Sequence, residues 1–185
     1  LGNCIDIWSG NFDLTNIPPD ELARQITFRA AIKFYAIQRI ELFDGAWQNP
    51  RLIHLAPNIR GMYDQTNALT DWCLTTILAT PETEKKTIGS YFAQIVRTLY
   101  ELQNFTDISA FPDSLRDIPL SKKDEELVKE VNDLLALDQN QQALRELHKT
   151  LLTSKKPALP AISVISGDFA KSAETEIVNN KLNLK

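Results

Sequence analysis

Residues that could carry out covalent chemistry are few in this sequence and lie far apart. The two histidines, His54 and His148, have no cysteine or carboxylate beside them at the spacing of a metal site, which needs three or four converging ligands. The sequence has no phosphate-binding glycine loop, nucleophile elbow or zinc-binding HExxH segment. The carboxylates at residues 124–126 stand at a helix start and are expected to form a solvated face. We therefore expect no metal, no cofactor and no conventional enzyme active site.

Composition favours one globular domain. The 185 residues are 43% hydrophobic, which suffices for a sizeable core. The net charge of −4, without a long run of Lys or Arg, argues against nucleic-acid binding. No apolar run approaches the ~20 residues that cross a bilayer, and the first residues do not resemble a secretory signal. Because the chain starts with Leu1, we expect it to be part of a longer protein.

Two cysteines and two tryptophans are expected in the interior. Cys4 and Cys73 are too few and too far apart to suggest a disulfide framework, so we expect inert thiols in a reducing, cytoplasmic compartment. Trp47 and Trp72 each offer a large apolar area, and a buried indole N–H needs a hydrogen-bond partner. We expect both rings to pack in the core and neither to touch a binding partner.

Apolar residues recur at helical spacing along the first half of the chain. Residues 18–21, Pro-Pro-Asp-Glu, are a good helix start, and the apolar positions behind them indicate two short helices. Asn58 is expected to cap a long central helix, whose apolar stripe runs to residue 77. The next helix is expected to start at residues 80–82.

The second half continues the same pattern. A stripe of apolar residues between residues 88 and 102 predicts a core helix. Ser121 and Asp124 approximate a capping box for the helix that follows, and leucines between residues 144 and 151 predict one more. The Pro-rich residues 155–160 are expected to form an extended connector. The pattern as a whole predicts an all-α, irregular multi-helix domain.

Three motifs follow one another near the start of the chain. They are PPDELARQIT at residues 18–27, IELFDGAW at residues 40–47 and LAPN at residues 55–58. Their order and spacing resemble the catalytic domain of Ras-family guanine-nucleotide exchange factors, the domain carried by Son of sevenless. The resemblance continues downstream through Trp72, ELQNF at residues 101–105, Ile118-Pro119, PALP at residues 157–160 and KLNLK at residues 181–185.

The resemblance implies one RasGEF-like catalytic domain over residues 1–185, with a helical hairpin. Two departures from the family pattern are expected to matter. The chain is short around residues 106–116, where the family presents a turn to its GTPase, so either this protein lacks that turn or residues after Ala110 are missing from the sequence. The domain is also expected to be incomplete at its C-terminus, where the second helix of the hairpin should begin. On that basis, residues 167–185 are expected to pack poorly, and this chain alone is expected to exchange nucleotide weakly.

The resemblance also implies a site on the hairpin. Residues 167–174 are the candidate wedge that moves the switch I region of a GTPase. Ala170 takes the position of the apolar residue that intrudes on the magnesium site, and Glu174 that of the carboxylate that competes for the phosphate-binding loop. Phe169 and Lys171 are further candidates for contact with the partner. The alternative for Glu174 is a solvated surface acid.

A second contact surface is implied on the central helix. Met62, Thr66 and Asn67 take the positions that grip switch II of the GTPase. Periodicity alone favours the core for Met62. Thr66 is a poorer core candidate, because a hydroxyl buried without a partner costs about 1–3 kcal/mol. For Tyr63 the core interpretation is preferred.

The resemblance leaves two functional interpretations and one bland alternative. The first is an exchange factor for a Ras, Rap or Ral type GTPase, which acts by binding, without covalent chemistry. The second is an adaptor that keeps the fold, has lost exchange, and binds a GTPase or a signalling scaffold. The third is an unrelated helical bundle. In the first two cases we expect a cytoplasmic protein that other domains could recruit to membranes, without direct insertion and without nucleic acid.

Overall fold

The computed structural model describes residues 14–137, 141–154, 156–175, 177–178 and 181–182, and side chains only as far as residue 169. The all-α prediction is confirmed over these residues, in which the one sheet pairs two short antiparallel strands, β1 (Ile177–Val178) and β2 (Lys181–Leu182). No helix in the described part of the chain is long and apolar enough to cross a membrane. The helices, with 3-10 helices labelled η, are η1 (Leu14–Asn16), α1 (Pro19–Ala36), η2 (Arg39–Gly45), η3 (Ile53–Leu55), α2 (Pro57–Ala79), α3 (Lys85–Glu101), η4 (Asp107–Ala110), α4 (Pro112–Leu115), α5 (Lys122–Leu135), α6 (Gln142–Ser154) and α7 (Ile162–Thr175).

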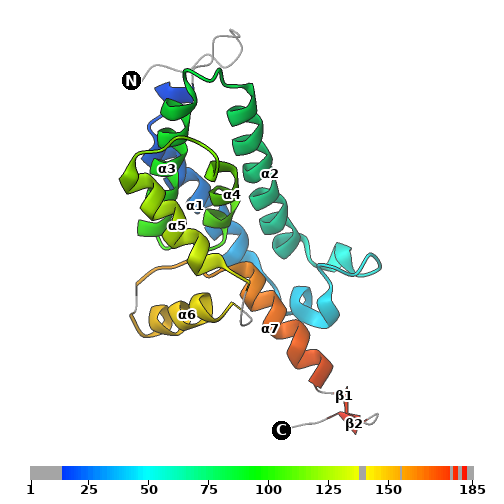
Figure 1. Cartoon of the computed structure of the whole chain (residues 1–185). Helices are drawn as coiled ribbons and strands as arrows, with labels where there is room; N and C mark the ends of the chain where they lie inside the picture. The colour runs from blue at the N-terminus through cyan, green and yellow to red at the C-terminus, as the bar shows by residue number, and fades with distance from the viewer. Residues whose placement is uncertain (1–13, 138–140, 155, 176, 179–180, 183–185) are drawn as a thin grey trace, which may run out of the picture.

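The core lies around α3, which packs against α1, α2 and α5 (Figure 1). The predicted stripe is confirmed in the centre of α3, where four apolar residues are 0% exposed, while Ile88 and Leu102 at its two ends are half-buried. A smaller apolar cluster joins η2, the start of α2 and the start of α7. The fully buried residues of the α3 stripe are Phe92, Ile95, Val96 and Leu99.

The first helix, α1, is a single element, where the sequence pattern indicates two short ones. No Gly or Pro interrupts residues 20–36, so the backbone has no reason to break there. The change in the apolar pattern has another cause. Ile32 and Tyr35 are 56% and 78% exposed, so they lie outside the core rather than on a second buried face.

The start of α2 is held by a carboxylate from a distant position rather than by Asn58, which lies inside the helix. Glu41 is 1% exposed and accepts hydrogen bonds from the backbone N–H groups of Asn58 at 2.7 Å and Ile59 at 3.0 Å. The side chain of Asn58 instead donates to Glu41 at 2.8 Å and to the carbonyl of Ala36 at 3.0 Å. Glu41 thus fills the role that the sequence assigns to Asn58, since free N–H groups at a helix start favour an anion.

The starts of α3 and α5 can be compared with the starts that the sequence pattern predicts. α3 begins at Lys85, after a turn that includes residues 81–84, because Pro81 opens the turn rather than the helix. At α5 the predicted cap is confirmed in its first half, because the Ser121 hydroxyl accepts the Asp124 N–H at 3.3 Å. The Asp124 carboxylate accepts from the Ser121 hydroxyl and from Arg97. Gly89 lies where α3 passes closest to the loop before α5, and a Cβ there would come within 2.6 Å of Ile118.

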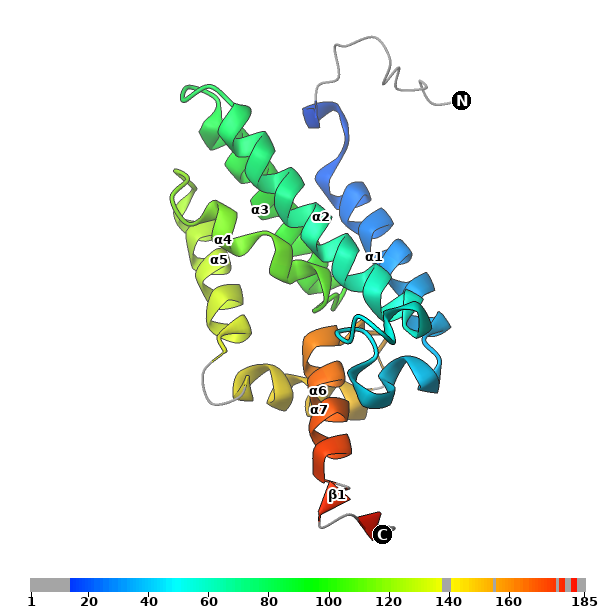
Figure 2. The ribbon, with the colours of Figure 1, turned by 90° about the vertical axis from the view of Figure 1, so that its right-hand side faces the viewer.

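The extended connector before α7 is confirmed and fixes where α7 begins. Leu159 exchanges backbone hydrogen bonds with Gln103 at 2.9 Å and Phe105 at 2.8 Å. The helix then starts at Ile162, whose N–H donates to the hydroxyl of Thr106 at 3.3 Å. From there α7 leads away from the body of the domain toward β1 and β2 (Figure 2).

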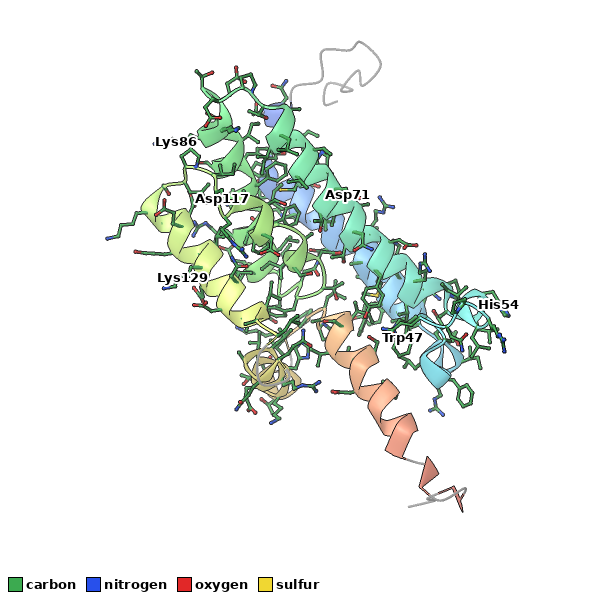
Figure 3. All side chains as sticks on the ribbon, turned by 45° about the vertical axis from the view of Figure 1, so that its right-hand side comes forward. Trp47, His54, Asp71, Lys86, Asp117 and Lys129 are labelled. Carbon is green, nitrogen blue, oxygen red and sulfur yellow. The ribbon has the colours of Figure 1, made fainter. Side chains whose placement is uncertain are left out.

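Both tryptophan rings pack against the core as predicted, Trp47 more completely than Trp72, while the expectation that neither touches a partner stays a prediction. Trp47 is 4% exposed in the cluster beneath the start of α2, and Figure 3 shows it at the end of the molecule that also carries the exposed His54. Its indole N–H has no hydrogen-bond partner among the described residues, so that part of the expectation is wrong. Trp72 is half-buried, edge-on to Phe92 with ring centroids 5.0 Å apart.

Candidate functional site

One polar contact joins the central helix α2 to α7. The Tyr63 hydroxyl lies 2.8 Å from Oγ of Ser166, which is 1% exposed. The Ser166 hydroxyl also donates to the Ile162 carbonyl at 2.8 Å, so Tyr63 is the donor in its own bond with Ser166. Burial raises the pKa of the Tyr63 phenol, which keeps it protonated as this role requires. Tyr63 is half-buried, in partial agreement with its predicted core position.

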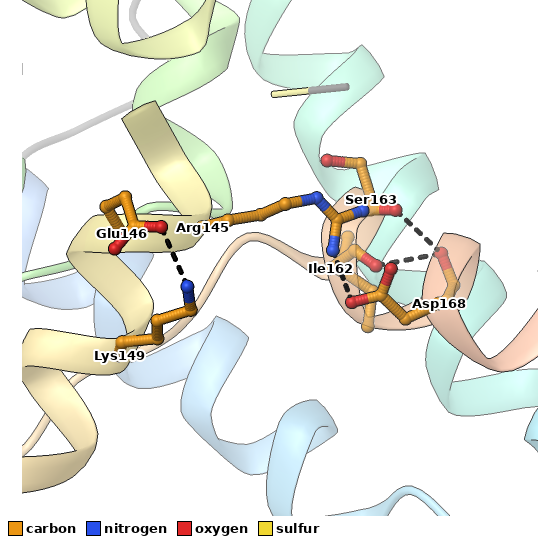
Figure 4. Close-up of polar contacts among 7 residues, drawn as sticks. Arg145, Glu146, Lys149, Ile162, Ser163 and Asp168 are labelled. Atoms are coloured by element: carbon orange, nitrogen blue, oxygen red, sulfur yellow. Dashed lines mark hydrogen bonds and ion pairs between the residues drawn. The ribbon is translucent and has the colours of Figure 1, made fainter. Parts of the chain in front are cut away.

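On its other side α7 faces α6, and Figure 4 draws one of the contacts between the two helices, the pair of Arg145 with Asp168. The Arg145 guanidinium pairs with the Asp168 carboxylate at 2.5 Å, across a groove of about 370 Å³ between the helices. Nε2 of His148 accepts the backbone N–H of Ala161 at 3.1 Å, directly before α7 begins. Burial, and then the charge of Arg145, lowers the pKa of His148, which favours the neutral ring that this bond needs.

A buried carboxylate lies beneath the middle of α2. Asp107 is 0% exposed, and its Oδ2 accepts hydrogen bonds from the side-chain amides of Gln65 at 3.1 Å and Asn104 at 3.0 Å. Its Oδ1 accepts the hydroxyl of Thr66 at 3.2 Å. Burial raises the pKa of Asp107, although the hydrogen bonds from Asn104, Thr66 and Gln65 act in the opposite direction. These bonds fix the side of α2 that carries Thr66.

A lysine from α1 completes this network. Lys33 donates to the carbonyl of Gly61 at 2.8 Å and to Oε1 of Gln65 at 3.0 Å, so it ties α1 to α2. Burial, and then the nearby Arg29, lowers its pKa. The attraction of Asp107 acts in the opposite direction. The result is a polar layer between α1, α2 and η4, whose amide, hydroxyl and carboxylate groups hold one another in place.

The three predicted contact residues of α2 do not share one environment. Met62 is 1% exposed and packs in the cluster with Trp47, so its assignment to the partner surface is wrong in this conformation and the core interpretation holds. Thr66 is half-buried, with its hydroxyl also donating to the Met62 carbonyl at 3.2 Å. Asn67 is exposed. Of these three residues, Asn67 and the outer part of Thr66 are therefore the ones available to a partner.

The predicted wedge residues all belong to α7. Phe169 is 47% exposed. Ala170, Lys171 and Glu174 lie in the helical backbone, and their side chains are outside the described residues. Ala170 and Glu174 are one turn apart, which places both on one helix face.

Residues 106–116, where the chain is short of the family pattern, are compact. They contain η4 and α4, and Phe111 is 0% exposed. The resemblance implies that a polar turn facing the GTPase is shortened or missing here. In the structure, most of these residues pack in the core. The carboxylate of Asp107, which the sequence analysis passed over, is the first residue of η4.

Several residues that fix this site were missed in the sequence. Asp107 lies two residues after the ELQNF segment, and a carboxylate between Phe105 and Ile108 is the one signal that could have marked it as buried and paired. Arg145 and Asp168 are separated by 22 intervening residues, so no helical spacing connects them.

No group of His, Cys, Asp and Glu in the described part of the chain could hold a metal ion. Cys73 is buried, which raises its pKa to about 12, while Cys4 lies outside the described residues.

Comparison with known proteins agrees with this architecture. The family model described as the RasGEF domain matches residues 21–185, and the chain belongs to this family. It is 28% identical over 173 residues to Ras guanine nucleotide exchange factor J of Dictyostelium discoideum, covering 89% of this chain and 21% of that protein. It is 27% identical to the mouse Ras-specific guanine nucleotide-releasing factor RalGPS1, covering 92% of this chain and 32% of the relative.

A third relative is the Son of sevenless homolog of Caenorhabditis elegans. The identity is 29% over 106 residues, or 57% of this chain and 7% of that protein. The chain thus spans about a third or less of each of these three relatives. The likeness concerns one domain within much longer proteins.

Proposed function

We propose that this domain is a guanine-nucleotide exchange factor for a small GTPase of the Ras subfamily, of Ras, Rap or Ral type. Membership of the RasGEF family supports the class, and the relatives are named as exchange or releasing factors. The observation that carries the proposal furthest is the Tyr63–Ser166 hydrogen bond. It anchors the base of α7 one turn from Thr66 and Asn67, so that one GTPase could touch α2 and α7 together.

In the proposed mechanism the domain acts by binding alone. Asn67 and the outer part of Thr66 hold the switch II region, while the last turns of α7 enter beside switch I. Ala170 and Glu174 would then disfavour the bound magnesium ion and the phosphates of the nucleotide. Because coupling between two ligands is reciprocal, tight binding to the nucleotide-free GTPase weakens nucleotide binding by the same factor. No bond is made or broken in the protein.

Where the protein acts is part of the same proposal. The buried thiol of Cys73 is consistent with a reducing, cytoplasmic compartment. Recruitment to a membrane would depend on other domains.

An adaptor that keeps the fold without exchange is the second candidate. The buried packing of residues 107–115 favours it, because Phe111 and Leu115 are 0% and 1% exposed where the family presents a turn to the GTPase. An adaptor would bind its partner without preferring the nucleotide-free state.

Reciprocity gives the test that separates the two candidates. The affinity of the full-length protein should be measured for nucleotide-free and for GDP-loaded Ras, Rap and Ral proteins, with a Rho protein as control. An exchange factor must bind the nucleotide-free form of its partner at least tenfold more tightly, and added GDP must displace it. Equal affinity for both forms would count against exchange and favour the adaptor.

A further inference from the structure

The direction in which α7 leaves the domain is held from two sides. On one side α7 packs on η2 and α2, where Ile162 lies in the apolar cluster with Trp47. On the other side lies α6, with a groove of about 370 Å³ between the two helices. Across a groove of this size, close packing cannot fix the angle of α7 relative to α6. On this side of α7, that angle therefore depends on the few polar contacts that cross the groove.

Among the described residues, polar contacts reach from α6 both to the residue before α7 and to the middle of α7. His148 accepts the N–H of Ala161 at 3.1 Å, and Arg145 pairs with Asp168 at 2.5 Å. Figure 4 shows the Arg145 side chain reaching across from α6 to Asp168 on α7. Ala161 and Asp168 are seven residues apart, which is about 10 Å along a helix. Two attachment points at this separation restrain α7 on the side that faces α6, and so add to the hold of η2, α2 and the Tyr63–Ser166 bond on the opposite side.

We infer that Arg145 and His148 are positioning residues, which brace α7 from the side opposite η2 and α2 and so help to set the angle at which it projects from the domain. The inference rests on the proposed function for its consequence, since α7 is the proposed wedge. Neither side chain touches the GTPase in this account. Both act through the helix that does.

The ion pair is only partly covered, with side-chain exposures of 23% for Arg145 and 50% for Asp168. A pair of this kind contributes modestly, so its loss should shift the angle of α7 without unfolding the domain. A modest shift in the angle of α7 is enough to slow nucleotide release, because a wedge at the wrong angle reaches the nucleotide site of the bound GTPase less often. We expect Arg145→Ala to lower the maximal rate of nucleotide release about three- to fivefold, the range that weak ion pairs allow. The KM for the GTPase should change less than twofold, because α2 supplies the binding surface.

Matched variants show whether the rate depends on the contact between α6 and α7 or on the individual side chains. Asp168→Ala should match Arg145→Ala, and the double variant Arg145→Asp with Asp168→Arg should recover most of the rate. For the second attachment point, His148→Leu removes the acceptor for Ala161, whereas His148→Gln offers a carbonyl oxygen in its place and should recover the rate. Circular dichroism of each variant shows whether the fold is retained.

A direct readout of the angle is the distance between spin labels on Lys129→Cys in α5 and Phe169→Cys in α7, in a full-length protein from which Cys4 and every accessible cysteine outside these 185 residues have been removed. The distance distribution should be narrow without further substitutions, broaden in Arg145→Ala and His148→Leu, and narrow again in the charge-swapped variant. An unchanged distribution in Arg145→Ala and His148→Leu would overturn the inference. A changed distribution with unchanged release would overturn the role of the two residues in exchange.

The two arms also separate this inference from the proposed function. If the full-length wild-type protein releases nucleotide from no GTPase, the proposed function fails and the distances still decide the inference. If the wild type is active and the variants match it in both arms, the inference alone fails.

Discussion

The hydroxyl of Tyr63 on α2 lies 2.8 Å from Oγ of Ser166 on α7, and this one hydrogen bond spans 103 residues of sequence. It sits one helical turn from Thr66 on one side and one turn from Ala170 on the other. The predicted contact surface of α2 and the predicted wedge on α7 are therefore linked through the Tyr63–Ser166 hydrogen bond, which we call the polar joint.

Removing this joint should loosen α7. Tyr63→Phe deletes the donor, while Ser166 keeps its bond to the Ile162 carbonyl, so the cost should be about 0.5–1.5 kcal/mol in the free energy of unfolding. Ser166→Ala should cost a similar amount. Urea unfolding of both singles and of the double variant checks this, since a shared bond predicts that the double loses less than the sum. Fully additive losses would show that the bond contributes nothing.

The buried Asp107 should respond to two substitutions in opposite ways. Asp107→Ala leaves the buried amides of Gln65 and Asn104 without their acceptor and should cost about 2–4 kcal/mol. Asp107→Asn can keep every bond, because its oxygen accepts from both amides while its NH2 donates to the Thr66 hydroxyl, which still donates to the Met62 carbonyl. Thermal unfolding should therefore rank the alanine variant well below the asparagine variant. Equal losses would contradict this network.

The comparison of the wild type with Asp107→Asn also tests how the free energy of unfolding depends on pH. The folded pKa of Asp107 is raised by burial, so the native state holds this proton more tightly than the unfolded chain. The stability that the carboxyl contributes is fully present below its unfolded pKa of about 3.9, and it is lost as the pH rises through the higher folded pKa. Stability of the wild type relative to Asp107→Asn should therefore fall with rising pH across that window. A flat difference would mean that the folded pKa is not raised.

Glu41 should behave in the opposite way. Burial alone would raise its pKa, but hydrogen bonds from Asn58, Gln38 and Ile59 outweigh this effect and lower it. Its contribution is present above the unfolded pKa and is lost as the pH falls through the lower folded one. Glu41→Gln turns an NH2 group toward backbone donors and should cost about 1–3 kcal/mol at neutral pH, measured by urea unfolding. A cost below 0.5 kcal/mol would show that α2 does not depend on this carboxylate.

Two glycines provide a matched comparison of packing. Gly89→Ala would place a Cβ 2.6 Å from Ile118 and 2.9 Å from Leu120, so we expect a loss of about 1–3 kcal/mol. Gly167→Ala, in α7, meets no described atom within 4 Å and should gain about 0.5–1 kcal/mol from its better helix propensity. Denaturant midpoints should shift in opposite directions. A shift in the same direction for both would contradict the packing around α3 or the helical state of residue 167.

Much of the fold follows from local pattern, and most of the site does not. The stripe of α3 and the cap at Ser121 were predictable because each depends on residues within a few positions of one another. The cap of α2 was not, because Glu41 reaches it from a different element. Met62 fits the apolar period of α2, and only burial decided between core and surface. The ties that Arg145 and Tyr63 make to α7 join residues distant in sequence, which no periodicity encodes.

The contact surface on α2 can be tested apart from the wedge. Asn67 is exposed, so Asn67→Glu should leave the melting temperature within a degree or two while weakening binding to the GTPase at least threefold, through loss of contact and added charge. Thr87→Glu, exposed at the start of α3, adds the same charge away from the proposed interface and should change neither. Surface plasmon resonance with the nucleotide-free GTPase gives both values. Equal binding by the two variants would remove Asn67 from the interface.

The central claim is that α7 promotes nucleotide release from a Ras-subfamily GTPase. The most direct measurement is the release rate of fluorescent GDP from Ras, Rap, Ral and Rho proteins with saturating full-length protein, for the wild type and for Glu174→Ala. The account predicts that at least one Ras-subfamily protein loses its nucleotide ten or more times faster with the wild type, and that Glu174→Ala removes most of this acceleration. Release at the intrinsic rate from every GTPase, or full acceleration by Glu174→Ala, would contradict it.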